Sequence, residues 1–357
     1  MSYMPNALIA CQTLQEDLAT QWQAEGTQGA DEMMPLEEVL MSEANRRNVT
    51  ALMAPGNAKK REVELKYTPR LTEDEVEEDV DNPKCSATNK SGELSTTYTM
   101  PDSNIGYSEL LEIDDFTNWC GDNGTRFLSR VNAIVDVLER KVATQHAEEF
   151  ALLAGTWGNG LFTTGNAVGN VNSSNEYVWA TRYSDGKPNP EAMGNLRIAR
   201  MKAGLESGVV GFGGTDAWTY FQALQIGCCA DSGMDLLEAS RQFALGYAYD
   251  KRLEAALASS LKFMLYRLGS VQPLFYTNNQ WKNGAAPIFQ GGDYLHTGIF
   301  APRTGMPMDL TIKDNCGALS IAVAVSTKLI VVPGDQFQSN DPYFGRNGVA
   351  KVLITNP

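Results

Sequence analysis

The sequence contains very little histidine, with only His146 and His296 in 357 residues. Imidazole is the commonest metal ligand and a frequent general acid or base at neutral pH, so either chemistry would depend on these two residues. His146 lies within a predicted helix beside glutamine and glutamate, where we expect a solvent-exposed helix face. His296 follows Asp293 and Tyr294 in a turn-like segment, where we expect a structural hydrogen bond. We therefore predict no catalytic residue, no metal ligand and no bound cofactor.

Motifs of the common enzyme and metal-site classes are missing as well. The sequence has no nucleophile elbow, zinc-protease helix, paired-cysteine motif or EF-hand loop. The glycine-rich GFGGTD at 211–216 lacks the spacing of a phosphate loop and places Asp216 where an anion would bind. Adjacent Asp114 and Asp115 favour capping roles over an acid and base pair. Six cysteines lack metal-ligand spacing and are expected as buried thiols: Cys11, Cys85, Cys120, Cys228, Cys229 and Cys316.

Positive charge and long apolar runs are also scarce. The chain has 29 Lys and Arg against 43 Asp and Glu, a formal net charge of -14. Because each DNA phosphate contact needs a Lys or Arg, we expect at most weak, salt-sensitive contact with DNA and no deep basic groove. No run reaches the roughly 20 apolar residues that span a bilayer, and the N-terminus lacks a signal-peptide pattern. We expect a soluble protein that is made in the cytoplasm and has no membrane partner.

The longest regular pattern in the sequence predicts a helix over Gly124–Gly155. Its apolar residues mostly recur at three- and four-residue steps, and no proline interrupts them. Asp122, Asn123 and Thr125 can each cap the start of the helix, and Gly155 can end it. About thirty residues at roughly 1.5 Å each give a rod about 45 Å long. Because heptad repeats are missing elsewhere, we expect a strut across a sheet rather than a coiled coil.

Residues 61–100 predict a long two-stranded excursion. Val63, Leu65 and Tyr67 alternate with charged residues, as in a half-buried strand, and STTYTM at 95–100 predicts the return strand. An isolated hairpin of this kind is marginal in water. We therefore expect Val63, Leu65 and Tyr67 to pack on a neighbouring subunit.

The connection between these two strands is strongly acidic. Seven carboxylates crowd into nine positions from Glu73 to Asp81, among them Glu75 and Glu78. Like charges this close become costly when a loop is pressed against a surface, so we expect basic groups of an adjacent subunit nearby. The candidates are Arg126 and Arg130, or the basic residues at 59–61. A solvated loop is the alternative that the sequence leaves open.

The remaining patterns alternate between helix and strand. Helices are predicted at 189–203, from a Thr215 cap to about 226, at 231–252 and at 253–261. Strands are predicted at 209–210, 262–274, 309–312, 319–326, 328–332 and 349–355, so the chain is expected to end inside a sheet. This mixture predicts an α+β fold with more than one core.

The order of these parts resembles the Hong Kong 97-type major capsid protein of tailed bacteriophages. Three segments carry the resemblance: VVGFGGTDAWTYF at 209–221, FALGYAYDKRLEAAL at 243–257, and the stretch from GIFAPRTGMP to VVPGDQF at 298–337. The resemblance implies an N-terminal arm (1–60), an extended loop (61–120), a peripheral domain with a spine helix (121–195), an axial domain (196–304) and returning C-terminal strands (305–357).

The same resemblance implies a function in assembly. Copies would form hexamers and pentamers of an icosahedral virion shell around double-stranded DNA, with scaffold, portal and decoration proteins as candidate partners. Some relatives crosslink subunits through a lysine and an asparagine, for which Lys84, Lys90 and Asn340 are candidates that nothing local marks. Two alternatives stay open: an encapsulin-like shell around protein cargo, and a soluble enzyme or ligand-binding protein with a cleft in residues 196–304.

Overall fold

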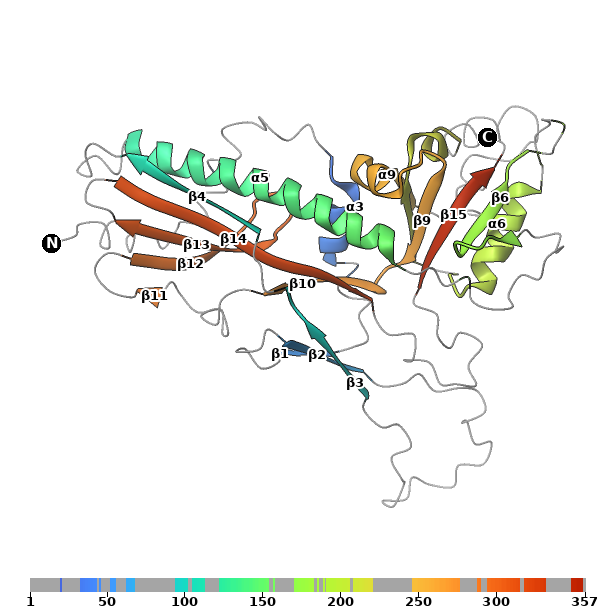
Figure 1. Ribbon diagram of the computed structural model, residues 1–357, viewed down its shortest axis with the longest axis horizontal. Helices are drawn as coiled ribbons and strands as arrows, with labels where there is room; N and C mark the ends of the chain where they lie inside the picture. Colours follow the sequence, from blue (N-terminus) through green and yellow to red (C-terminus); the bar gives the residue numbers. More distant parts are fainter. Residues whose placement is uncertain are drawn as a thin grey trace, which may run out of the picture.

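The structure is a computed structural model. It describes residues 20, 33–43, 45, 52–55, 62–67, 94–101, 105–112, 122–153, 157, 170–182, 185, 189, 191–205, 208–220, 246–276, 288–289, 294–314, 318–331 and 348–355. These residues form an elongated body with a sheet in each half and a third, small sheet that projects from it (Figure 1). Helices and strands are both abundant, which confirms the predicted α+β class.

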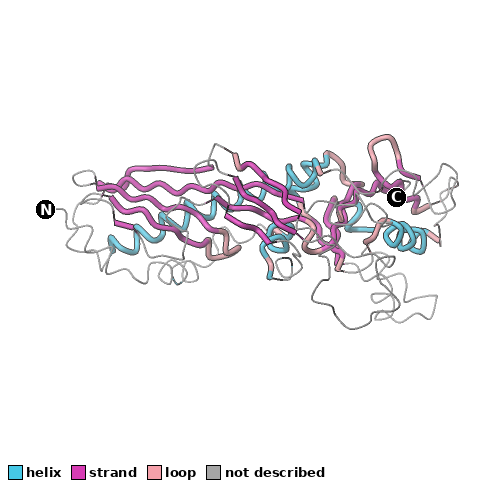
Figure 2. Tube along the Cα trace, turned by 90° about the horizontal axis from the view of Figure 1, so that it is seen from below, coloured by secondary structure: helices cyan, strands magenta, loops and turns pink. Residues whose placement is uncertain are grey.

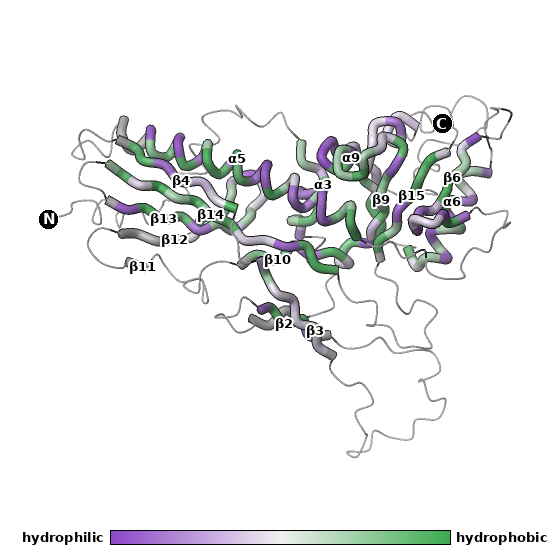
Figure 3. Tube along the Cα trace, in the orientation of Figure 1, coloured by the Kyte–Doolittle hydropathy of each residue, from purple (hydrophilic) through white to green (hydrophobic). Residues whose placement is uncertain are grey.

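The long predicted helix is confirmed as α5, Asp122–Leu152, with 31 residues. Its apolar stripe packs on strands that come from distant parts of the chain, and in Figure 3 hydrophobic and hydrophilic residues alternate along its length. Figure 1 shows the helix lying along the sheet. Figure 2, which views the molecule from below, shows the strands of this sheet in front of the helix. The helix is a strut across a sheet, as predicted.

The sheet under α5 has six strands. Its order is β10 (Val271–Tyr276), β14 (Ala318–Val331), β13 (Pro307–Asp314), β12 (Tyr294–Phe300) and β11 (Ile288–Phe289), and β4 (Ile105–Glu112) also pairs with β14. β14 is one strand of 14 residues where the sequence predicted two. Its first part pairs with both β13 and β4, and its last part pairs with β10.

The second sheet also has six strands, in the order β5 (Asn170–Val171), β6 (Glu176–Ala180), β15 (Val349–Thr355), β9 (Lys262–Arg267), β7 (Val209–Gly213) and β8 (Gly246–Tyr249). β15 lies between β6, which is parallel to it, and β9, which is antiparallel. The prediction of a terminal strand inside a sheet is therefore confirmed. Helix α6 (Ala192–Lys202) packs in the core on one side. Helices α3 (Pro35–Met41), α9 (Lys251–Leu257) and the end of α5 share the core on the other.

The projecting sheet contains β1 (Leu52–Pro55), β2 (Glu62–Tyr67) and β3 (Leu94–Thr99). β2 and β3 are the two predicted strands of the excursion, and they pair antiparallel. β1 was not predicted, because residues 1–60 were expected as a loose arm. In Figure 1 this sheet leaves the body on the side away from α5.

Three expectations about element boundaries need correction. Residues 246–249, which were expected to belong to a helix over 231–252, form strand β8, which pairs with β7. The strand predicted over 262–274 is two strands in different sheets, separated by a turn in which Gly269 has a φ of 91°. The loop predicted over 61–120 includes β4, which belongs to the sheet under α5. In each case pairing with a distant strand overrides the local pattern.

Candidate functional site

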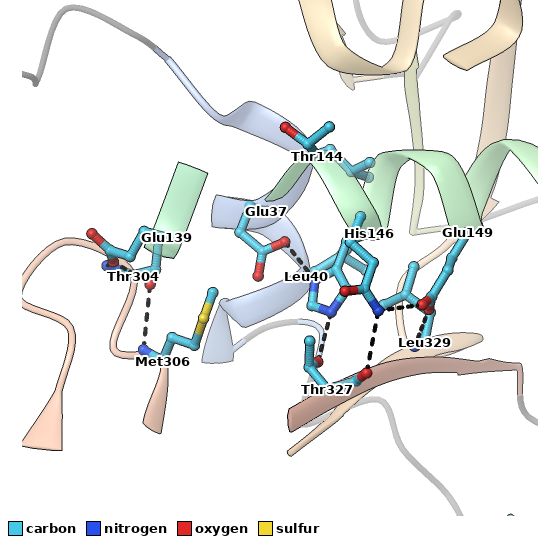
Figure 4. Close-up of polar contacts among 12 residues, drawn as sticks. Glu37, Leu40, Glu139, Thr144, His146, Glu149, Thr304, Met306, Thr327 and Leu329 are labelled. Carbon is cyan, nitrogen blue, oxygen red and sulfur yellow. Dashed lines mark hydrogen bonds and ion pairs between the residues drawn. The ribbon is translucent and has the colours of Figure 1, made fainter. Parts of the chain in front are cut away.

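A fully buried histidine joins three elements near the middle of the body. The Nδ1 atom of His146 on α5 lies 2.7 Å from Glu37 Oε2 on α3, and its Nε2 atom lies 2.7 Å from Thr327 Oγ1 on β14 (Figure 4). The side chains of His146 and Glu37 are 0% and 1% exposed. The prediction of an exposed face for His146 is wrong. Val142 and Phe150, four residues to either side, are also fully buried, so the helical period contained the signal.

Glu149 joins the same strand, β14, to α5 at a second point. Glu149 Oε2 accepts a hydrogen bond from the Leu329 backbone N–H at 2.7 Å, and Gln145 Nε2 donates to Glu149 Oε1 at 2.7 Å. These residues lie one helical turn from His146 or beside it, so α5 and β14 are joined by side chains as well as by apolar packing (Figure 4).

The segment that contains α3 is fastened to both halves of the body. Asn45 is fully buried, donates to the carbonyls of Leu40 (2.9 Å) and Val271 (3.1 Å), and accepts from the Gly269 N–H (2.8 Å). Asp250 accepts from the Leu36 N–H at 3.2 Å and also caps α9. Residues 33–43 and Asn45 therefore form a clasp, in a region where the sequence predicted an arm with a short helical patch from Pro35 to Asn48.

Glu139 is a buried carboxylate on the sheet-facing side of α5. Its Oε1 atom accepts hydrogen bonds from the backbone N–H and hydroxyl of Thr304, at 3.1 Å and 2.6 Å. Burial raises the pKa of Glu139, and the nearby Asp136 raises it further, although the two hydrogen bonds and Arg303 oppose the shift. The carboxylate stabilises the turn between β12 and β13 (Figure 4).

The candidate contact residues of β2 include one that is buried within the chain itself. Leu65 is fully buried in a cluster with Met100, Leu274 and Ile330 of the same chain, and Val63 packs partly against this cluster. The expectation of packing on another subunit is thus wrong for Leu65. For Val63, which is half-buried, it stays a prediction. β10 and β14 provide the covering surface, and they come from far later in the sequence. The Tyr67 side chain lies outside the described residues.

The two candidate arginines of α5 have different surroundings. Arg126 is exposed. Arg130 makes an ion pair with Glu109 of β4 within the chain. The hydrogen bond and charge of Arg130 lower the pKa of Glu109, although partial burial opposes this. Arg130 therefore already has a carboxylate partner, whereas Arg126 keeps the role of a candidate contact.

A groove of about 580 Å³ runs between α5 and α9. Four of its lining side chains are cationic and one is a carboxylate: Arg140, Lys141, Lys251, Arg252 and Glu148. Arg140 is oriented by an ion pair with Asp136 at 2.7 Å. The sequence predicted no deep basic groove, and this cluster was missed because its two walls are far apart in the chain.

The glycine-rich turn after β7 is filled by the chain itself. A Cβ atom on Gly213 would lie 2.4 Å from Phe263 Cβ, and one on Gly214 would lie 2.3 Å from the Ser260 carbonyl. Helical residues begin at Thr215, so Gly214 occupies the cap position predicted for Thr215, whose hydroxyl donates to Glu254 at 2.8 Å. Close packing against β9 and against Ser260 just before it is therefore what requires these glycines.

Several predicted features lie outside the described residues. These are the acidic run with Glu73, Glu75 and Glu78, the pair Asp114 and Asp115, all six cysteines, the crosslink candidates Lys84, Lys90 and Asn340, and the His296 side chain, whose backbone lies in β12. Within the described part of the chain, no three His, Cys, Asp or Glu side chains form a group that could hold a metal. No helix among the same residues is long and apolar enough to cross a membrane.

Comparisons with known proteins found similarity only to solved structures. No family model matches the chain, and no curated protein matches it. It is similar to the capsid asymmetric unit of cyanophage A-1(L), with 12% identity and a TM-score of 0.46 over 88% of this chain and 93% of that one. It is also similar to the capsid of Myoviridae phage XM1, with 9% identity and a TM-score of 0.39 over 90% and 92%. It is similar as well to the capsid of the native GTA particle, with 11% identity and a TM-score of 0.39 over 87% of this chain and 89% of that one.

Proposed function

We propose that this chain is a structural protein, the major capsid protein of a tailed bacteriophage, which self-assembles into an icosahedral shell around double-stranded DNA. The observation that carries the proposal is the projecting sheet β1–β2–β3. It leaves an elongated body and contacts it through the small cluster around Leu65. A projecting element on a rigid body is suited to reaching a neighbouring copy.

The body has the rigidity that a wall subunit needs. Helix α5 contributes to the apolar core of its own sheet and, through Phe150, to the core that it shares with the second sheet. The clasp at 33–45 adds buried hydrogen bonds between the two halves. Because these contacts span both halves, bending between them would break buried interactions.

The elements follow the order that the sequence resemblance implies, but the two large sheets do not follow its domain bounds. β5 and β6, within 121–195, lie in the sheet around β15, and β10, β11 and β12, within 196–304, lie in the sheet under α5. In this proposal α5 is the spine helix, the sheet beneath it forms the peripheral domain and the sheet around β15 forms the axial domain. The excursion with β2 and β3 is the extended loop, shorter at its C-terminal end than 61–120 because β4 joins the peripheral sheet. Copies would form hexamers and pentamers in the virion after synthesis in the host cytoplasm.

Exposed apolar side chains are consistent with surfaces that other copies cover. Leu110 on β4 is 57% exposed, Val137 on α5 is 52% exposed and Leu152 at the end of α5 is 82% exposed. Single exposed apolar residues are ordinary, but Leu110 lies on β4, Val137 midway along α5 and Leu152 at the end of α5, and a neighbouring copy could cover each of these surfaces in a closed wall.

The test is expression of the full chain followed by size-exclusion chromatography and negative-stain electron microscopy. A capsid subunit gives closed particles of uniform diameter in the megadalton range, and particles recovered with a packaging system hold nuclease-resistant DNA. Protein cargo in place of DNA would indicate a nanocompartment. A small oligomer that stays small under all assembly conditions would contradict the proposal.

A further inference from the structure

Strand β4 is a long strand at an edge of the sheet under α5. It has eight residues and pairs with β14 alone among the strands that the structure describes. Helix α5 packs on residues of β12, β13 and β14, so it lies over a face of the sheet and not over this edge. Gly106, Tyr107, Ser108 and Leu110 on the strand are exposed. The backbone groups on the outer side of β4 are therefore accessible to another strand.

Every other strand at the end of a large sheet, in the part of the chain that the structure describes, is short or contains a proline. β11 and β5 have two residues each, and β8 has four. β10, which pairs with the last part of β14, contains Pro273. Short strands and prolines protect an edge, because they limit pairing with a strand of another molecule. β4 has neither proline nor lysine, so its edge lacks this protection.

The sequence of β4 is complementary to itself when two copies run antiparallel with Ser108 opposite Ser108. Ile105 and Leu111 pack toward α5, so the alternate residues Gly106, Ser108 and Leu110 face away from the helix. On that face, each Leu110 lies opposite Gly106 of the other copy, where no side chain obstructs it. Leu110 is 57% exposed in the single chain, and this pairing would cover it.

Other antiparallel registers fit less well. A slip of two residues in one direction places Glu109 opposite Glu109 of the second copy, and like charges directly opposite each other are destabilising. A slip of two residues in the other direction leaves Leu110 beyond the end of the partner strand. The register centred on Ser108 instead places Tyr107 opposite Glu109, so that a hydroxyl donor faces a carboxylate. The side chains of β4 therefore favour one register.

The charges beside β4 allow two copies to approach, although each chain carries a formal charge of -14. Glu109 makes an ion pair with Arg130 of α5 in its own chain. Arg126, one helical turn before Arg130, is exposed and adds positive charge on the same side of the helix. The carboxylate of β4 would therefore meet a second copy with its charge balanced.

We propose that β4 pairs with β4 of a second copy, antiparallel and about a two-fold axis at Ser108, so that the two sheets under α5 become one continuous sheet. This inference rests on the proposed function, because it takes the second copy to be a neighbour in the shell. Both copies contribute the same residues to the contact. An edge of eight residues is about 27 Å long and too narrow to bury the roughly 800 Å² per partner of a standard interface. The pairing is therefore weak between free subunits and depends on the other contacts of the wall.

The test adds one cysteine to β4 at either of two exposed positions. Ser108→Cys places two sulfur atoms opposite each other across the axis, where the Cα atoms of paired strands are roughly 4.5 to 5.5 Å apart and a disulfide can form. Leu110→Cys is the matched control on the same face of the strand, because in this register its two Cα atoms are about 14 Å apart. Particles, and unassembled subunits over a concentration series, are oxidised mildly and separated by non-reducing electrophoresis. The wild-type chain, with six cysteines of its own, gives the background.

We expect several-fold more covalent dimer from Ser108→Cys than from Leu110→Cys or the wild type, in particles and in concentrated subunits. Equal crosslinking by the two variants would overturn the inference, because it would reflect random collisions. If particles form and Ser108→Cys stays at the background, the inference fails while the proposed function stands. If the wild-type chain forms no particles, the proposed function fails, and the concentrated subunits still decide whether two β4 strands pair.

Discussion

His146 shows how a polar side chain is held in the interior of this protein. Both of its ring nitrogens have a partner, and the partners come from α3 and β14. Glu37 pairs through one oxygen, while its Oε1 atom is buried without a hydrogen-bond partner among the described residues. A buried group of this kind depends on its neighbour, since burial without a partner costs several kcal/mol.

Replacement of His146 by leucine should therefore destabilise the folded subunit strongly. We expect a loss of about 3 to 5 kcal/mol in the free energy of unfolding, because Glu37 is left buried without its partner. The double variant His146→Leu with Glu37→Leu should recover part of this loss. Urea unfolding of unassembled subunits measures both, with Glu148→Gln on the exposed face of α5 as the control. Losses that simply add in the double variant would show that the two residues are not coupled.

Glu139 gives a prediction about pH. Because burial raises its pKa in the folded state, the stability that the protonated carboxyl group contributes is present below the unfolded pKa and is lost as the pH rises through the folded pKa. Glu139→Gln keeps an oxygen for the Thr304 donors and has no charge to bury. We expect this variant to be more stable than the wild type at pH 7 and to lose that advantage as the pH falls toward 4. Thermal unfolding across this range measures the difference, and an advantage independent of pH would contradict the assignment.

At the scale of elements, the clasp at 33–45 combines a short helix with a set of buried hydrogen bonds. A helix of 7 residues has little stability of its own, so its position depends on tertiary contacts. Asn45 supplies the contacts with the turn between β9 and β10.

Asn45→Ala should loosen the clasp. We expect a cost of about 2 to 4 kcal/mol, because the Gly269 N–H and the Val271 carbonyl lose a buried partner. Glu38→Ala is the matched control: it removes an exposed ion pair with Arg303 and should cost less than about 1 kcal/mol. Hydrogen exchange at Gly269 should accelerate only in the Asn45 variant. Equal costs for both variants would mean that the clasp contributes no more than a surface contact.

Helix α5 should be sensitive to a break even where its side chain is exposed. Val137 is 52% exposed on the outward face, so Val137→Ala should change stability by less than about 0.5 kcal/mol. Val137→Pro removes a backbone donor and clashes with the preceding turn, so it should cost about 3 kcal/mol or more. Circular dichroism during thermal unfolding compares the two. Similar melting temperatures would show that the strut is not needed as one continuous helix.

At the scale of the whole molecule, assembly should stabilise the fold. In the proposed shell, other copies would bind the folded subunit and not the unfolded chain, so mass action would raise the melting temperature as protein concentration increases. We expect this rise under assembly conditions and its disappearance in a buffer that keeps subunits apart. Differential scanning calorimetry over a hundredfold concentration range measures it. A melting temperature independent of concentration in both buffers would contradict self-assembly.

The elements that the sequence alone determined are those whose side chains follow one local period. Residues close together in sequence were enough to predict four of these elements: α5 from its apolar stripe, β2 from its alternation, β3 from its composition, and the terminal strand β15. The exposed position of Arg126 belongs to the same class, because it lies off the apolar stripe.

Tertiary structure decided everything that depends on partners far away in the chain. β14 is one strand because β13, β4 and β10 together cover its length, and β9 and β10 separate because each finds a different sheet. The burial of His146 depends on Glu37 and Thr327, and the α5–α9 groove exists only where two distant helices meet. Local periodicity indicates which face of an element is buried. Which other element covers that face is decided by long-range contacts, including those that satisfy buried polar groups.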